Sequence, residues 1–174
     1  LKGRTVGVIG YGKIGRRTGE LMHAFGCRVL AQRRGERQVV PDFVELVSQE
    51  ELLRRSDIVA LHCPLNDSTR GMIDYAKLSL MKKSAMLINV ARGPVVNERD
   101  LVRALEEGLI AGACVDVFNT EPPLPADTPL LGAPNTLLTP HVAFATRESM
   151  ALRARIVFDN LRAWLDGGQL NAVL

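Results

Sequence analysis

Short apolar runs alternate with helix-length segments along most of this chain. Six runs have the length and β-branched composition of strands: 5–10, 27–32, 57–63, 85–91, 110–118 and 135–140. Between most of them, apolar residues recur at spacings of three and four, as in KIGRRTGELMHAF, EELLRRS, YAKLSLMKK and NERDLVRALEEG. Strands that are apolar on both faces and separated by helices predict a parallel sheet covered on both sides. The expected fold is a doubly wound, Rossmann-like α/β domain that occupies residues 1–174.

Local signals agree with these boundaries. Ser48 precedes a predicted helix with Glu51 three residues later, an arrangement typical of a capping box, and Asn97 and Gly108 bracket another helix. The proline-rich stretch 119–130 is expected to be a loop. The last segment, 147–166, should be a helix packed on the sheet, with its large apolar residues in the core: Met150, Ile156, Val157, Leu161, Trp164 and Leu165.

Composition narrows the class of protein. The chain has 174 residues, 47% of them hydrophobic and 24% charged, and a net charge of +3, which is typical of a globular domain without a nucleic-acid-binding basic block. No run of about 18 apolar residues predicts a membrane span. Three cysteines without paired spacing favour reduced thiols and a cytoplasmic location. No metal site is expected. The start at Leu1, directly before a strand, suggests a piece of a longer polypeptide.

A glycine-rich loop follows the first predicted strand. Gly10, Gly12 and Gly15 have G-x-G-x-x-G spacing at the start of a helix. In this motif the glycines permit a tight turn, the approach of a pyrophosphate, and close packing of helix on strand, and the phosphate binds the helix N-terminus. A glycine-rich turn kept only for packing is the alternative. The order strand, loop, helix, strand favours a dinucleotide site.

The stretch RVLAQRRG, residues 28–35, ends the second predicted strand. An acidic residue usually stands there and binds the ribose hydroxyls of the cofactor, whereas this chain has Arg33 followed by Arg34. A guanidinium can bind a 2′-phosphate through two parallel hydrogen bonds, and a carboxylate would repel it. The pair therefore predicts NADP as the preferred cofactor over NAD. The alternative is a solvated basic turn in an enzyme that accepts either.

Three further stretches end at the carboxyl side of successive strands, where ligands bind in open parallel sheets. They are NVARGPVVNERDL, VDVFNTEPP and TPHVAFAT, and LHCPLNDSTRGMID precedes them. With these four motifs in this order, the chain resembles the D-isomer-specific 2-hydroxyacid dehydrogenase family over nearly its whole length. The resemblance implies the cofactor domain of an oxidoreductase that transfers a hydride between NAD(P) and a small 2-keto or 2-hydroxy acid, with glyoxylate or hydroxypyruvate as plausible substrates.

The chemistry of the matching residues agrees with that role. Histidine titrates near neutrality, so His141 can exchange a proton with a substrate carbonyl, while Glu121 orients it and Arg92 binds a carboxylate or a keto oxygen. The family places the nicotinamide carboxamide on the residue that matches Asp116. The resemblance implies further cofactor contacts at the following positions: Lys13, Ile14, Cys63, Pro64, Thr69, Val90, Ala91 and Arg92.

Each of these residues also has a plain structural explanation. His141 after a proline could be an ordinary loop residue, Glu121 a surface turn, and Arg92 a residue that caps a strand. Asp116 could be a buried acid that backbone donors satisfy. Taken together, however, they favour the catalytic interpretation, because a basic, an acidic and a titratable residue would otherwise have to follow successive strands by chance.

Two departures from the family and one missing part qualify the prediction. Arg33 replaces the acidic residue, and Phe144 stands where a small glycine is common, which would narrow the nicotinamide pocket. The family's substrate domain is absent from this chain, so we expect dinucleotide binding but little turnover. Formate and phosphite dehydrogenases and a dinucleotide-sensing corepressor remain alternatives. A homodimer through the region around 138–150 and the following helix is expected from the family.

Overall fold

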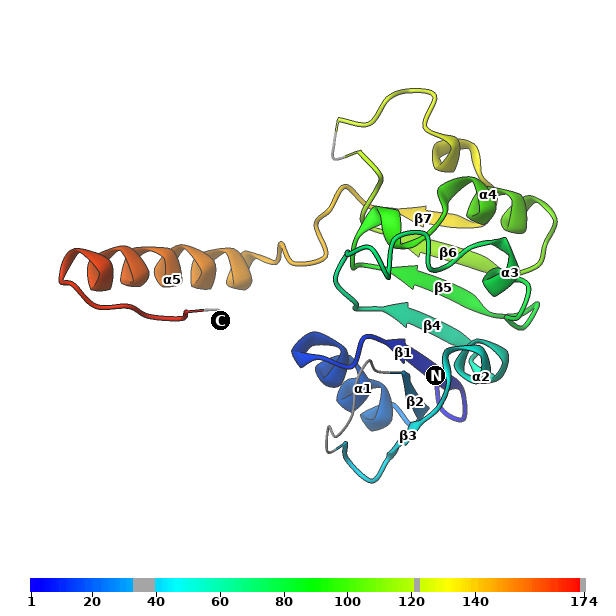
Figure 1. Ribbon diagram of the computed structural model, residues 1–174, viewed down its shortest axis with the longest axis horizontal. Helices are drawn as coiled ribbons and strands as arrows, with labels where there is room; N and C mark the ends of the chain where they lie inside the picture. The colour runs from blue at the N-terminus through cyan, green and yellow to red at the C-terminus, as the bar shows by residue number, and fades with distance from the viewer. Residues whose placement is uncertain (33–39, 121–122, 173–174) are drawn as a thin grey trace. The chain divides into compact units, whose positions relative to one another are not determined.

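The computed structural model describes residues 1–32, 40–120 and 123–172, and these residues form two compact units, Leu1–His141 and Val142–Leu174. Within the described residues, the first unit holds a seven-stranded parallel sheet in the order β3-β2-β1-β4-β5-β6-β7 (Figure 1). Its strands are β1 Thr5–Ile9, β2 Arg28–Gln32, β3 Val44–Leu46, β4 Ile58–Leu61, β5 Met86–Asn89, β6 Gly112–Val115 and β7 Thr136–Leu138. The predicted fold class is confirmed.

Helices separate most of the strands. They are α1 Lys13–Ala24, α2 Gln49–Arg55, α3 Tyr75–Leu78 and α4 Glu98–Glu106, with short 3₁₀ turns η1 Gly93–Val95 and η2 Pro129–Gly132. The predicted caps form: Ser48 Oγ accepts from Glu51 N at the start of α2, and the Asn97 side chain accepts from Asp100 N at the start of α4. Both polar caps satisfy backbone donors that the helix leaves unpaired.

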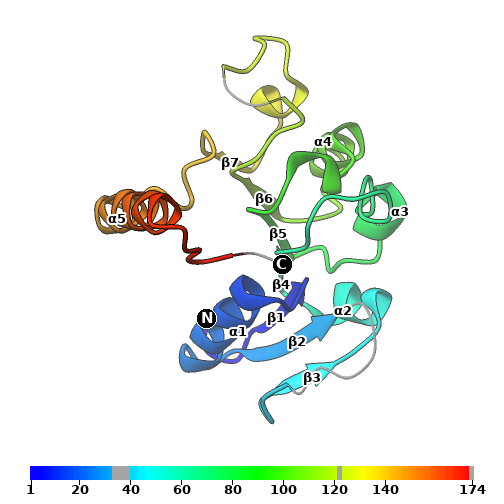
Figure 2. The ribbon, with the colours of Figure 1, turned by 60° about the vertical axis from the view of Figure 1, so that its left-hand side comes forward.

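Two apolar clusters lie on opposite faces of the sheet. Helix α1 covers β1 and β2 on one face, while α2, α3 and α4 lie on the other (Figure 2). Val6 and Val8 join the α1 cluster, whereas the intervening strand positions face α2. On the α1 face of β5 and β7, Met86 is 40% and Leu137 63% exposed. Coverage of both faces, as expected from the sequence, therefore holds for β1 and β2 but not for these positions.

The second unit contains the long helix α5, Arg147–Leu165. The Thr146 side chain accepts from Ser149 N, and the Ser149 side chain accepts from Thr146 N, which forms a capping box. No residue of this helix is buried, and Trp164 and Leu165 are 71% and 76% exposed. The helix was predicted correctly, and within its own unit its large apolar residues are not buried, so their expected place in the core stays a prediction. No helix in the described ranges has the length and apolar character needed to cross a membrane.

Candidate functional site

The sheet order places a crevice at the carboxyl end of β1. Strand β1 has β2 as its neighbour on one side and β4 on the other. The order in which strands are added to the sheet therefore reverses direction between β1 and β4. Ligands of doubly wound sheets bind outside the strand ends at such a switch point. A pocket of about 270 Å³ lies there. Its walls come from the ends of three strands: Ile9, Gly10, Tyr11 and Gly12 after β1, Gln32 in β2, and His62, Cys63, Pro64, Asn66, Thr69 and Met72 after β4.

The three glycines of the loop differ in their steric surroundings. Gly10 has a φ of +94°, and a Cβ there would lie 2.5 Å from the backbone nitrogen of Cys63. A Cβ on Gly15 would lie 2.2 Å from the carbonyl oxygen of Gly10, so this glycine lets α1 pack on the loop. At Gly12 a Cβ would meet no atom of the described residues within 4 Å. The space in front of Gly12 is therefore open to a ligand.

Helix α1 begins at this opening without a side-chain cap. Gly12 is its N-cap residue and the first turn contains no acidic residue. The first backbone N–H groups of a helix have no intrahelical acceptor, and the helix dipole favours negative charge at this end. Lys13 and Ile14, both exposed, stand beside the opening. A pyrophosphate group fits this cradle in both charge and space.

The turn after β4 forms the opposite wall of the pocket. The Thr69 hydroxyl donates to the Pro64 carbonyl at 2.7 Å and accepts from Asn66 N at 2.8 Å, so it fixes the turn that carries Cys63 and Pro64. Thr69 was predicted as a cofactor contact, which stays a prediction, and the structure shows that its hydroxyl holds this wall in shape.

His62 presents a buried polar atom in the same pocket. Its Nε2 is inaccessible to solvent and has no hydrogen-bond partner among the described residues. Burial lowers the pKa of this imidazole, because the charged form would lose its solvation. A neutral ring with an unsatisfied nitrogen is suited to meeting a polar group of a ligand. His62 was not selected from the sequence, because the signal that marks it is the burial of its ring in the folded chain.

A second group of polar residues stands at the ends of β5, β6 and β7. Asn89 ends β5 and is 1% exposed. Its Oδ1 accepts from Ala91 N at 3.1 Å, and its Nδ2 donates to the Arg92 carbonyl at 3.1 Å. The side chain thus holds the turn Val90–Arg92 in one conformation. Arg92 is exposed and caps η1, with Nη1 donating to the Ala91 carbonyl. Asn89 is a positioning residue that was quoted in a motif but not selected.

Asp116 and His141 are joined through the backbone. Asp116 follows β6 and is 4% exposed, and its Oδ1 accepts from the Thr139 hydroxyl at 2.5 Å. His141 N donates to the Asp116 carbonyl at 2.8 Å, and His141 has a φ of +56°. Asp116 N in turn donates to the Asn89 carbonyl at 3.0 Å. The ends of β5, β6 and β7 are therefore linked, and Thr139, which was not selected from the sequence, orients the Asp116 carboxylate.

Removal of the Asn89 amide should loosen this edge of the sheet. Asn89→Ala leaves the buried Ala91 N–H and the part-buried Arg92 carbonyl without their partner, and we expect a loss of about 1–3 kcal/mol in the free energy of unfolding. Urea denaturation of both proteins measures this. The exposed cap residue Asn97 provides a control, since Asn97→Ala should cost only about 1 kcal/mol. An Asn89→Ala protein as stable as the parent would contradict the positioning role.

Three predicted site residues lie outside the described residues: Arg33, Arg34 and Glu121. Apart from Lys13, Ile14 and Gly15 at the start of α1, the remaining ones divide into two groups along one edge of the sheet. Gly10, Gly12, Cys63, Pro64 and Thr69 line the pocket at β1 and β4. Val90, Ala91, Arg92, Asp116 and His141 follow β5, β6 and β7. Parallel strands place all their carboxyl ends at the same edge, as the arrowheads in Figure 1 indicate.

The family model for the D-isomer specific 2-hydroxyacid dehydrogenase, NAD binding domain, matches residues 1–143. The chain belongs to this family. A hydroxypyruvate reductase of Blautia hydrogenotrophica is 41% identical over 177 residues, an alignment that covers 99% of this chain and 54% of that protein. The chain spans about half the length of the relatives that it matches.

Solved structures of similar proteins have the same fold. A D-isomer specific 2-hydroxyacid dehydrogenase from Lactobacillus delbrueckii ssp. bulgaricus, in its NAD-complexed form, superposes with a TM-score of 0.87 at 34% identity over 98% of this chain and 56% of that one. An acyclic imino acid reductase in complex with NADPH and D-Arg gives a TM-score of 0.89 at 32% identity over 100% of this chain and 55% of that one. The part of this chain that matches the family model, residues 1–143, is therefore an NAD(P)-binding domain.

Phe144, the departure from the family that was expected to narrow the nicotinamide pocket, lies in the second unit. There the guanidinium carbon of Arg153 lies 5.3 Å from the centre of its ring. A cation over an aromatic face stabilises both side chains modestly. The effect of Phe144 on the pocket stays a prediction.

Proposed function

We propose that residues 1–174 form the cofactor-binding part of an oxidoreductase that transfers a hydride between NAD(P) and a small 2-keto or 2-hydroxy acid. The observation that carries this proposal is the shared edge of the sheet. An open phosphate cradle at Gly12 and the linked residues Asp116 and His141 all follow carboxyl ends of parallel strands. A dinucleotide with its pyrophosphate at α1 would extend along this edge toward β5, β6 and β7.

Each of these residues then has its own role in binding or in proton transfer. Gly10, Gly12 and Gly15 shape the cradle, and the N–H groups at Lys13 and Ile14 bind the pyrophosphate. Asp116, oriented by Thr139, accepts from the nicotinamide carboxamide. The bound nicotinamide cofactor supplies or receives the hydride. Arg92 binds the substrate carboxylate or keto oxygen, and His141 transfers the proton at the carbonyl oxygen, with Glu121 orienting the imidazole.

The proton-transfer role has a direct test in a polypeptide that joins this chain to a substrate domain. His141→Gln should lower kcat for reduction of hydroxypyruvate by about 10²–10⁴-fold, the usual contribution of a general acid. The Kd for the cofactor should stay within about twofold, since the dinucleotide keeps its cradle. Stopped-flow loss of NADPH absorbance measures the first and fluorescence titration the second. An undiminished kcat would exclude His141 as the acid.

We also propose that NADP is preferred, on the basis of Arg33 and Arg34. Replacement of a guanidinium that binds a 2′-phosphate removes a charge-assisted pair, and a carboxylate in its place repels the phosphate. Arg33→Asp should therefore weaken NADPH binding by at least about tenfold and leave NADH binding equal or tighter. Titration followed by nicotinamide fluorescence measures both. Arg99→Asp, an exposed residue of α4, is the control. Equal affinities for both cofactors in the parent chain would mean that RVLAQRRG is only a solvated turn and does not select NADP.

The substrate side requires more than this chain. We infer that the acid is bound by a further domain, because the relatives are about twice as long, and that residues 1–174 alone turn over glyoxylate or hydroxypyruvate poorly. The exposed apolar residues of α5 form a surface of the kind that another subunit covers in a homodimer, or that another domain covers. The reduced state expected of the cysteines favours the cytoplasm.

A further inference from the structure

A second pocket, of about 510 Å³, lies at the amino ends of the strands. Thr5 and Arg28, the first residues of β1 and β2, line it together with the last turn of α2. The cradle at Gly12 follows the carboxyl end of β1, so the two pockets occupy opposite edges of the parallel sheet. Its volume is within the range of pockets that bind small molecules. No residue discussed above for the cofactor or the substrate lines it.

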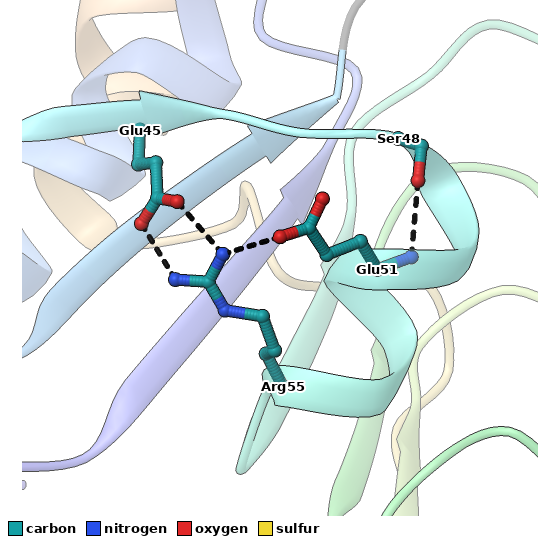
Figure 3. Close-up of polar contacts among 4 residues, drawn as sticks. All are labelled: Glu45, Ser48, Glu51 and Arg55. Atoms are coloured by element: carbon teal, nitrogen blue, oxygen red, sulfur yellow. Dashed lines mark hydrogen bonds and ion pairs between the residues drawn. The ribbon is translucent and has the colours of Figure 1, made fainter.

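The lining of this pocket carries more basic than acidic side chains. Four basic residues, Arg28, Arg54, Arg55 and Lys82, line it together with one carboxylate, Glu45. Arg55 is neutralised: its Nη1 and Nη2 donate to Glu45 at 2.7 and 2.6 Å, and Nη1 also donates to Glu51 at 2.6 Å (Figure 3). The hydrogen bonds from Arg55 hold the pKa of Glu45 below its usual value. The Glu45 carboxylate is therefore ionised at neutral pH, and both of its oxygens are hydrogen-bonded to Arg55.

The other cations differ in their partners. Lys82 Nζ donates to Asp57 Oδ1 at 2.8 Å. Arg28 and Arg54 are exposed, and neither makes a side-chain hydrogen bond or ion pair within the described ranges 1–32, 40–120 and 123–172. Arg28 acts on Glu45 only through space. Two guanidinium groups, each with five donors in a planar fork, thus remain available at one pocket.

A flat aromatic wall stands beside these cations. The rings of His23 and Phe43 are stacked, with centroids 4.2 Å apart and an interplanar angle of 10°, and both residues line the pocket.

The position of Arg54 in the last turn of α2 is explained by the helix dipole alone. That explanation does not extend to Arg28, which begins a strand. Nor does it account for the aromatic wall.

We propose that this pocket binds a small organic phosphate, whose phosphoryl oxygens pair with Arg28 and Arg54 and whose organic part rests on Phe43. A guanidinium fork matches phosphoryl geometry in two parallel hydrogen bonds, and two such forks suit a dianion. The concave shape selects a small molecule over a flat acidic protein surface. This site is independent of the proposed hydride transfer at the opposite edge.

Phenyl phosphate and inorganic phosphate are the probes, followed by amide chemical shifts of the ¹⁵N-labelled chain. Phenyl phosphate should shift the amides of Arg28, Val29 and Glu45 and bind more tightly there than inorganic phosphate. The double variant Arg28→Ala/Arg54→Ala should weaken this binding by at least about tenfold. Both side chains are exposed and make no hydrogen bond to another described residue, so the variant should retain the parent spectrum and fold.

The phosphate cradle provides an internal comparison. Its amides at Gly10 and Gly12 report binding of the same probes at the opposite edge and should respond equally in the parent and the double variant. Arg99→Ala, which removes an exposed arginine of α4, should change neither set. Absence of shifts at Arg28 and Glu45, or an unchanged affinity in the double variant, would overturn the proposal. Equal affinity for both probes would overturn the organic part of it.

Discussion

Gly12→Asp should abolish dinucleotide binding while leaving the chain as stable as before or slightly more stable. Gly12 is the N-cap residue of α1, with extended backbone angles of −84° and −161°, and aspartate is among the preferred residues at that position. A Cβ at Gly12 meets no atom within 4 Å, so the fold accepts the side chain. The new carboxylate occupies the space and takes the N–H donors that the pyrophosphate needs, and it repels the phosphate charge.

We expect the Kd for NADH and NADPH to rise by at least about 100-fold, because like charges at close range cost several kcal/mol. The free energy of unfolding should stay within a few tenths of a kcal/mol of the parent or exceed it. Fluorescence titration and urea denaturation measure the two effects. Gly132→Asp is the matched control, since that glycine is also exposed with no atom near its Cβ position. Retained affinity in Gly12→Asp would mean that the dinucleotide binds elsewhere.

Gly93→Ala should produce the opposite pattern, a large loss of stability from a single methyl group. A Cβ on Gly93 would lie 2.1 Å from the carbonyl carbon and oxygen of Phe118 and 2.6 Å from Asn119 N. These are backbone atoms of the loop that follows β6, and they cannot rotate away as a side chain would. The turn that carries Arg92 must therefore separate from the loop after Asp116, and the linked strand ends are displaced.

Overpacking of this kind costs about 1–3 kcal/mol and occasionally more, and we expect about 3 kcal/mol here because the contact is with backbone. Urea denaturation with a fitted m-value measures it. Gly132→Ala adds the same methyl group at an unobstructed position and should change stability by less than about 1 kcal/mol. A Gly93→Ala protein within that limit would show that the two loops are not held as closely as the structure indicates.

The first half of the site could be predicted from the sequence because its signals are local. The glycine spacing, the strand before it and the helix after it lie within residues 5–24, and the structure shows a steric reason for Gly10 and Gly15, while Gly12 faces open space. By contrast, β3, Val44–Leu46, was not predicted, since three residues with Glu45 at the centre show no usable periodicity. Tertiary pairing with β2 makes it a strand.

The second half of the site depends on contacts between distant segments. Asn89 gains its role from a buried turn that only the folded chain defines, and Thr139 from its neighbour Asp116 on the adjacent strand end. The exposure of α5 is also invisible in the sequence, since its apolar spacing predicts a buried face without stating what covers it. Periodicity identifies a helix with an apolar face, but the partner of that face is a separate question.

The central claim is that the carboxyl edge of the sheet binds a nicotinamide dinucleotide across both groups of residues. Amide chemical-shift mapping of the ¹⁵N-labelled chain with NADPH tests it most directly. The account predicts that NADPH shifts the amides of both groups of residues: Gly10, Gly12, Cys63, Ala91, Asp116 and His141. At Arg28 and Glu45 the shifts should be no larger than those that phosphate alone produces in the second pocket. Shifts confined to residues away from the strand ends, or no binding at saturating cofactor, would contradict it.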